Sequence, residues 1–200
     1  MSLKLHIGCG TTPLPGWTNL DVAPYPGVDT VLDVRSGLPF ENVACIFAEH
    51  FIEHLTLDEG LAFLRECRRV LRDDGVLRLS TPNLDWVWLT HYKSPEAMTA
   101  EEQLFGCLEL NRAFHGWGHR FLFNLGTLSA ALRSAGFGTM APQRYGESEV
   151  PELRGLEQHE HHEDRPDAPS VIIVEARGHS AADGSFAELV APYLRDVRVT

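Results

Sequence analysis

The start of the chain constrains the fold more than any other part of it. An apolar run at residues 3–7 passes directly into Gly8-Cys9-Gly10, and a lone acid, Asp21, follows a second apolar run. Glycine lets the chain turn sharply, and without a Cβ it allows a ligand to approach the backbone closely. The pattern predicts an α/β sheet with a nucleotide-like ligand at the ends of its first strands, where Asp21 would accept hydrogen bonds from ribose hydroxyls.

Apolar runs short enough for buried strands recur along the chain, and helical patterns separate several of them. This alternation predicts a doubly wound α/β fold, with a mostly parallel sheet and helices on both faces. A length of 200 residues fits one such domain with a sizeable core. The expected strands are residues 3–7, 17–22, 30–32, 45–48, 76–80, 138–145 and 171–176.

Two helices of this pattern have well-marked ends. Thr56 and Glu59 form a capping box, in which each side chain satisfies a backbone N–H, and leucines follow on one face. Asp73-Asp74-Gly75 is expected to end this helix before the next strand. Asn124 is expected to cap the second helix, which would end at Gly136.

The section at about residues 83–124 differs from the rest, because it is rich in Trp, His and Phe and contains another capping box at Thr99 and Glu102. It is interpreted as a helical lid inserted over the carboxyl ends of the strands. Residues 1–178 are therefore expected to form one domain that includes this insertion, and residues 179–200 a small C-terminal appendage.

Composition narrows the classes of partner and the compartment. The net charge of −11 argues against a protein that holds a long nucleic acid, which needs a basic footprint. No run approaches the roughly 18 apolar residues of a membrane span, and the N-terminus lacks the apolar core of a secretory signal. Four cysteines without a CxxC pair favour a reduced, cytoplasmic protein.

The first crossover connection is unusually short. Only residues 8–17 separate the first two strands, fewer than the dozen or more that a parallel crossover normally uses, so the first helix is expected to be reduced to a turn or loop. Pro13 also stands where the dinucleotide fingerprint requires its third glycine. Both features disfavour a dinucleotide, because its pyrophosphate is held at the N-terminus of that helix.

Further segments occur in an order that resembles a subgroup of class I S-adenosylmethionine (SAM)-dependent methyltransferases. The resemblance covers roughly residues 3–85, and the combination is more specific than any one segment. Residues 64–75 depart from the family pattern at one position, because Asp74 stands where the family has a glycine. The matching segments are Gly8–Gly10 (GCG), 16–21 (GWTNLD), 33–40 (DVRSGLPF), 48–55 (AEHFIEHL), 64–75 (LRECRRVLRDDG) and the turn Pro82-Asn83.

The resemblance implies a seven-stranded sheet whose last strand is antiparallel, and SAM as the cofactor. It implies that Gly8, Cys9 and Gly10 line the methionine and ribose side of SAM. Glu49 and His50 would lie near the methionyl end.

The resemblance also implies how the two other parts of the nucleoside are held. Asp21 would accept hydrogen bonds from the ribose hydroxyls, and Val22 would pack on the adenine. Asp33 would accept a hydrogen bond from the adenine amino group, while the backbone N–H of Val34 donates to a ring nitrogen. The simpler interpretation of Asp21 and Asp33 is turn chemistry at strand ends, which Asp favours.

Methyl transfer to a hydroxyl or amine needs alignment, exclusion of water and a general base, for which histidine is best suited near neutral pH. His50, His115 and His119 are the candidate catalytic residues. His54 is expected to cap or pack at the entry of the helix. His115 and His119 lie in a glycine-punctuated loop at residues 111–120 that suits a mobile acceptor pocket, although ordinary hydrogen-bonded histidines of a lid fit equally well.

The expected acceptor is a small molecule or a saccharide-like compound. A sugar ring or another flat, partly apolar group would suit the aromatic side chains of the insertion, although these side chains could instead form its own core. They are Trp86, Trp88, Tyr92, Phe114 and Trp117.

Three alternatives accompany this interpretation. The same fold could serve as a non-catalytic SAM-binding or interaction module, or the chain could be an NAD(P)-dependent oxidoreductase. The His/Glu-rich residues 158–164 could suggest a metal site, but they lack a fixed ligand spacing on a helix. No metal is therefore expected, and this segment is interpreted as a loop that folds back toward the mouth of the active site.

Overall fold

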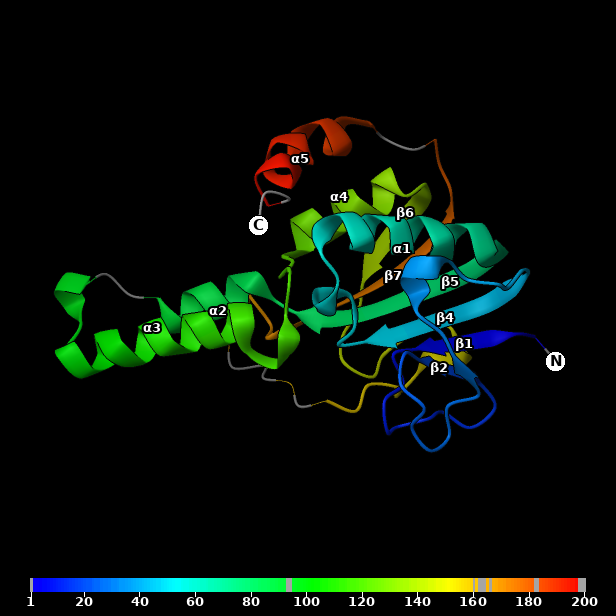
Figure 1. Ribbon diagram of the computed structural model, residues 1–200, viewed down its shortest axis with the longest axis horizontal. Helices are drawn as coiled ribbons and strands as arrows, with labels where there is room; N and C mark the ends of the chain where they lie inside the picture. The colour runs from blue at the N-terminus through cyan, green and yellow to red at the C-terminus, as the bar shows by residue number, and fades with distance from the viewer. Residues whose placement is uncertain are drawn as a thin grey trace.

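The computed structural model describes residues 2–92, 95–159, 161, 165, 167–181 and 184–197. Its centre is a seven-stranded mixed sheet in the order β3-β2-β1-β4-β5-β7-β6 (Figure 1). The strands β3, β2, β1, β4 and β5 pair in parallel, and β7 runs antiparallel to both of its neighbours. The strands are β1 (Lys4–Ile7), β2 (Thr18–Asp21), β3 (Thr30–Val31), β4 (Val43–Glu49), β5 (Leu71–Pro82), β6 (Phe137–Pro142) and β7 (Val171–His179).

The described residues also form five α-helices and five short 3-10 helices. The α-helices are α1 (Leu57–Val70), α2 (Leu84–His91), α3 (Ala100–His115), α4 (Leu125–Ser134) and α5 (Gly184–Val197). The 3-10 helices are η1 (Val34–Ser36), η2 (Ile52–His54), η3 (Pro95–Ala97), η4 (Gly116–Gly118) and η5 (Pro151–Leu153). No described helix is long and apolar enough to cross a membrane.

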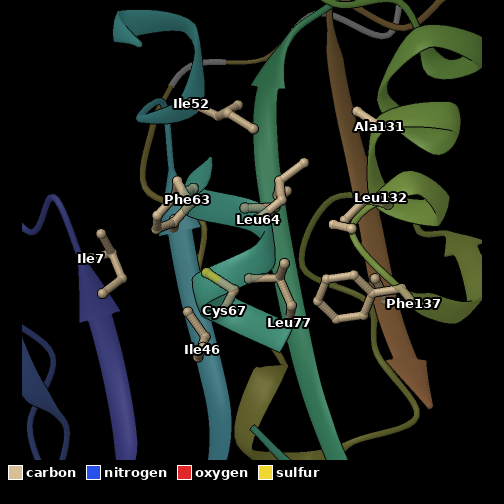
Figure 2. Close-up of a cluster of buried hydrophobic side chains, with 14 of the residues drawn as sticks. Ile7, Ile46, Ile52, Phe63, Leu64, Cys67, Leu77, Ala131, Leu132 and Phe137 are labelled. Carbon is tan, nitrogen blue, oxygen red and sulfur yellow. The ribbon is translucent and has the colours of Figure 1, made fainter. Parts of the chain in front are cut away.

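Helix α1 begins at the predicted capping box, in which the Thr56 hydroxyl accepts from the Glu59 N–H and the Glu59 carboxylate accepts from the Thr56 N–H. Its apolar face is buried against the sheet. Figure 2 shows Leu64 of α1 over Leu77 of the sheet, with Leu132 of α4 beside them. Full burial of each such side chain contributes about 1.5–3 kcal/mol to folding, so this layer supplies much of the stability.

The predicted end of α1 at Asp73-Asp74-Gly75 is wrong. The helix ends at Val70, and Leu71 already pairs with Val43 as the first residue of β5. A register shift between Val43 and Cys45 accommodates the two aspartates in an irregular part of the strand. Glycine is needed at position 75 because a Cβ would lie 2.9 Å from the Val43 carbonyl oxygen. The glycine therefore serves a close strand approach and not a helix end.

The expectation of helices on both faces of the sheet is also wrong. Helices α1, α4 and α5 lie on one face, where Phe186 of α5 joins the same core cluster as α1 and α4 (Figure 1). The opposite face has its own smaller cluster, in which Trp17, Phe47 and Leu153 pack together. Residues 8–17, all of which are described, form turns and no helix. Such a short connection has no room for a crossover helix, and the loop that carries η5 covers this face instead.

A buried charge fixes that covering loop to the sheet. The Arg78 side chain of β5 is fully buried and lies 2.6 Å from the Glu157 carboxylate and 2.8 Å from that of Glu175. Arg78 also donates to the backbone carbonyl of Glu147. A buried charge requires such partners, so the loop and the sheet are tied together at one point.

Helices α2 and α3 form a hairpin that projects from one end of the sheet (Figure 1). It leaves the sheet after β5, and its return is marked by a bridge between Asn83 and Phe123. Apolar side chains of α3 such as Leu104, Phe105 and Leu108 are largely exposed. The hairpin therefore borders the carboxyl end of β5, where parallel strands present their ligand sites.

Candidate functional site

Two cavities lie at the carboxyl ends of the parallel strands. The first, of about 620 Å³, is here called the glycine-loop cavity, and the second, of about 730 Å³, the hairpin cavity. His50 and His54 line both, so the two spaces adjoin at these side chains. The glycine-loop cavity is lined by Gly8, Gly10, Asp21, Val22, Asp33, Val34 and Arg35, and the hairpin cavity by Trp86, His91, Glu109, Arg112, Trp117, His119 and His159.

The glycine loop has the backbone conformation that its sequence predicts. Gly8 and Gly10 have φ angles of +67° and +50°, which residues with side chains rarely adopt. The Asp21 carboxylate accepts from the N–H of Gly10 at 2.9 Å and from the N–H of Ala23 at 2.9 Å. Each carboxylate oxygen keeps further acceptor capacity in a cavity that it lines. A ligand with two adjacent hydroxyls could be held there.

The far end of the same cavity combines apolar and charged groups. Val22 is exposed and lines it, as do Asp33 and the buried Val34. The Asp33 carboxylate caps η1 by accepting from the Arg35 N–H, and it lies 2.6 Å from the Arg35 guanidinium. This hydrogen-bonded pairing lowers the pKa of Asp33, so the carboxylate stays ionised as an acceptor.

Two residues of the predicted cofactor set lie outside this cavity. Cys9 is buried, and burial raises the pKa of its thiol. Glu49 is also buried, and its carboxylate accepts from the backbone N–H groups of Gln158 and His159. The structure thus uses Glu49 to fasten a distant segment at the end of β4.

His50 follows β4 in a left-handed conformation with φ of +46°, a strain that a non-glycine residue bears only when its surroundings fix it. Its Nδ1 lies 3.1 Å from a carboxylate oxygen of Glu53, and its ring lies against that of His159, with 4.5 Å between centroids. Glu53 is fully buried, and Thr81 donates to it at 2.9 Å. The resemblance gave Glu53 no role, yet its buried carboxylate lies beside the His50 ring.

The segment that contains His159 returns to the site. Besides its contact with His50, the His159 ring places Nδ1 3.1 Å from Glu49 and lines the hairpin cavity. Residues 160, 162, 163 and 164 of the His/Glu-rich run lie outside the described residues. The described part of the run therefore lies at the border of the two cavities.

The two histidines of the predicted mobile loop have different places. His119 lines the hairpin cavity, and its Nδ1 lies 2.8 Å from the carbonyl oxygen of Ala113. His115 is exposed at the end of α3 and is not among the lining residues of either cavity. The structure thus brings His50 and His119 to one space and leaves His115 outside it.

Of the five aromatic residues considered for an acceptor, two line the hairpin cavity. They are Trp86 and Trp117. Trp88 and Tyr92 stack on each other at 4.2 Å with exposed outer surfaces, and Phe114 is exposed. Trp86 and Trp117 are therefore the members of this set that border the hairpin cavity.

Several lining residues carry no family signal. Thr11, Tyr25 and Phe51 line the glycine-loop cavity, and Glu109 and Arg112 line the hairpin cavity. The last two are three positions apart on α3 and share one face of that helix. Their helical spacing next to the aromatic residues is the one sequence signal that could have indicated Glu109 and Arg112 as site residues.

Comparisons with known proteins agree with this architecture. No protein-family model and no curated protein matches the sequence. Solved structures do match. A SAM-dependent methyltransferase from Mesorhizobium loti has 17% identity and a TM-score of 0.54, over 88% of this chain and 90% of that one. A possible histamine N-methyltransferase from Thermotoga maritima has 15% identity and a TM-score of 0.54, over 88% and 82%.

PigF, solved with S-adenosylhomocysteine (SAH), matches with 16% identity and a TM-score of 0.52 over 88% of this chain. This chain spans about half the length of PigF, since the match covers 50% of it. At such identities the likeness concerns the fold. The chain therefore has the class I fold of SAM-dependent methyltransferases.

Proposed function

We propose that this protein is a SAM-dependent methyltransferase that acts on a small-molecule or saccharide-like acceptor. The observation that carries the proposal is the meeting of two cavities at His50 and His54. Methyl transfer requires a donor and an acceptor in line, held together in a space from which water is excluded. Two adjoining cavities of this size offer room for a donor and an acceptor next to each other.

The glycine-loop cavity is the proposed SAM site. Among the described residues, and apart from its two chain neighbours, nothing lies within 4 Å of the position of an added Cβ at Gly10, so the backbone there is open to a ligand. In this proposal Gly8 and Gly10 border the methionine and ribose, and Asp21 accepts from the ribose hydroxyls. Val22, Asp33 and Val34 would enclose the adenine. Cys9 and Glu49 would support the loop and the strand end without contacting SAM.

SAM supplies an activated methyl group on a positively charged sulfur. His50 is the proposed general base, because it lines both cavities and a neutral imidazole can accept a proton near neutral pH. Its Nε2 atom is buried and has no hydrogen-bond partner among the described residues. His119 is the second candidate, and its exposed neighbour His115 has no role in this proposal.

The hairpin cavity is the proposed acceptor site, with the α2–α3 hairpin as its lid. Trp86 and Trp117 offer flat apolar surfaces, while Glu109 offers hydrogen-bond acceptors and Arg112 offers donors. Aromatic faces combined with charged hydrogen-bonding groups suit a sugar ring or a similar hydroxylated compound. A cytoplasmic location is part of the proposal, supported by four cysteines that are all unpaired.

A dinucleotide-dependent reaction is less well supported. It needs a helix N-terminus after β1 for the pyrophosphate, whereas residues 8–17 form turns. The other alternative, a non-catalytic SAM-binding module, is distinguished from an enzyme by an assay of methyl transfer.

The test uses SAM labelled in its methyl group with a panel of hydroxylated acceptors, including mono- and oligosaccharides. We expect label transfer with formation of SAH, and a fall in kcat of about 100- to 10,000-fold for His50→Gln. The affinity for SAM should change little in that variant. SAM binding without transfer to any acceptor of the panel would favour the binding module, and transfer at the normal rate by His50→Gln would remove His50 as the base.

A further inference from the structure

Three metal-ligand side chains gather where the two cavities adjoin. Glu53 and His54 belong to η2, and His119 follows η4 at the base of the hairpin. One ligand atom from each lies within 4.8 Å of the others. Such a separation is close to the spacing of ligands around one ion, since metal–ligand bonds of about 2.0–2.2 Å keep ligand atoms within about 4 Å. The sequence gives no signature for this group, because His119 is distant from the other two along the chain.

The Glu53 carboxylate provides an independent indication. Its side chain is fully buried, and one of its oxygens has no hydrogen bond among the described residues. The contact of that oxygen with His50 Nδ1, at 3.1 Å, lacks hydrogen-bond geometry. A buried carboxylate without full compensation is costly unless it is paired or coordinates a metal.

The hydrogen bonding of His119 and His54 leaves ring nitrogens available to a metal ion. His119 Nδ1 lies 2.8 Å from the Ala113 carbonyl oxygen and can donate to it, which leaves Nε2 with a free lone pair. Ligand histidines commonly use such a backbone carbonyl to fix the ring and the tautomer. Among the described residues, no side-chain hydrogen bond to His54 is present, and its ring lies 5.3 Å from that of His119.

We propose that Glu53, His54 and His119 bind one first-row divalent cation, with Zn²⁺ or Fe²⁺ preferred over Mg²⁺. Two imidazole nitrogens and one carboxylate oxygen form a donor set that suits these ions, whereas Mg²⁺ prefers oxygen ligands alone. Three protein ligands leave coordination positions open, as in catalytic sites. His54 lines both cavities, so the open side adjoins the proposed acceptor site.

The role of the ion rests on the proposed function. An acceptor hydroxyl placed on the open side would have a lower pKa, because a bound cation stabilises the developing alkoxide. In the transfer, the hydroxyl proton passes to His50 and the oxygen forms a bond to the methyl carbon. The bond between that carbon and sulfur breaks, its electron pair stays on sulfur, and SAH leaves as a neutral thioether.

The test measures metal binding alone, without SAM or acceptor. The full chain is stripped with a chelator and titrated with Zn²⁺ in a calorimeter, and Co²⁺ is added in parallel as a visible-absorption probe. We expect one Zn²⁺ per chain and a Co²⁺ spectrum typical of mixed nitrogen and oxygen ligands. Loss of outer-shell partners alone costs 10- to 100-fold in affinity, so His119→Gln and His54→Gln should each weaken Zn²⁺ binding by at least about 100-fold.

The matched control is His179→Gln, which removes an exposed histidine that is not part of the cluster. It should bind Zn²⁺ like the unchanged chain. Thermal unfolding and SAH affinity, measured on the same variants, show whether each remains folded and keeps its cofactor site. Absence of Zn²⁺ binding, or equal binding by the His54→Gln/His119→Gln double variant, would overturn the metal site whether or not methyl transfer is observed.

Discussion

Gly8 lines the glycine-loop cavity, and replacing it by alanine tests whether the packing around the loop requires a glycine there. An added Cβ at this position would lie 2.5 Å from Cδ2 of Phe51, closer than real Cβ contacts allow. Phe51 cannot move away freely, because its ring packs against Phe63 at 5.2 Å between centroids. Gly8 also has a φ of +67°, which is strained for alanine.

Two costs follow from this geometry. The left-handed backbone costs alanine about 1–2 kcal/mol. Forcing the Phe51 ring aside in a packed region costs about 1–3 kcal/mol. Gly8→Ala should therefore reduce the free energy of unfolding by about 2–5 kcal/mol, which for a chain of this length lowers Tm by roughly 5–20 °C.

Gly10→Ala is the matched control, because Gly10 has a similar φ of +50°, but beyond its chain neighbours no described residue comes within 4 Å of the place where an added Cβ would lie. It should lose only about 1–2 kcal/mol of stability, from the backbone strain. Urea denaturation of Gly8→Ala, Phe51→Leu and the double variant that combines them measures the clash as a coupling energy. Gly10→Ala is measured beside them. Equal losses for Gly8→Ala and Gly10→Ala, within about 0.5 kcal/mol, would refute the steric argument.

Two further predictions concern buried ionisable groups. Arg78→Met leaves the buried Glu157 carboxylate without its cation, while Glu175 keeps its ion pair with Arg177. Urea denaturation should show a loss of about 3–5 kcal/mol in the free energy of unfolding, and a loss below about 1 kcal/mol would contradict the buried network. Burial lowers the pKa of His6, despite its hydrogen bond with Asn19, so the folded state resists protonation of this ring. The contribution of His6 to the free energy of unfolding is complete above its unfolded pKa of about 6.5. It declines by about 1.4 kcal/mol per pH unit as the pH falls toward the lowered pKa of the folded state. Compared with His6→Gln, the unchanged chain should therefore lose more stability between about pH 7.5 and 5.5, a window around that unfolded pKa, and parallel curves would contradict this.

Local chemistry was enough to predict part of the fold. The capping box at Thr56 and Glu59 satisfies backbone groups within one turn, so the sequence alone identifies the start of α1. The end of α1 was mispredicted, because the residues Asp73-Asp74-Gly75 are equally suited to a helix end and to an irregular strand. Pairing of Leu71 with Val43 decides between the two, and that contact is distant in sequence.

In the site, too, features set by nearby residues could be predicted, and features set by distant residues could not. Asp21 was predicted at the glycine loop, and its bond to the Gly10 N–H joins the end of β2 to the loop that follows β1. The task of Glu49 could not be predicted, because its hydrogen-bond partners Gln158 and His159 are more than 100 positions away. The burial of Glu53 depends likewise on the way that separate segments close over it. Family patterns identify strand-end residues, whereas partners supplied by long loops follow from the tertiary structure.

Equilibrium binding of SAH tests the central claim most directly, because it requires no knowledge of the acceptor. The comparison uses the unchanged chain, Asp21→Asn and the control Asp74→Asn, whose carboxylate is exposed in β5 and lies outside both cavities. Hydrogen bonds to a charged group contribute about 1.5–3 kcal/mol, so Asp21→Asn should weaken SAH binding about 10- to 150-fold, while Asp74→Asn binds normally. No SAH binding by the unchanged chain at millimolar concentration, or equal affinity in Asp21→Asn, would contradict the account.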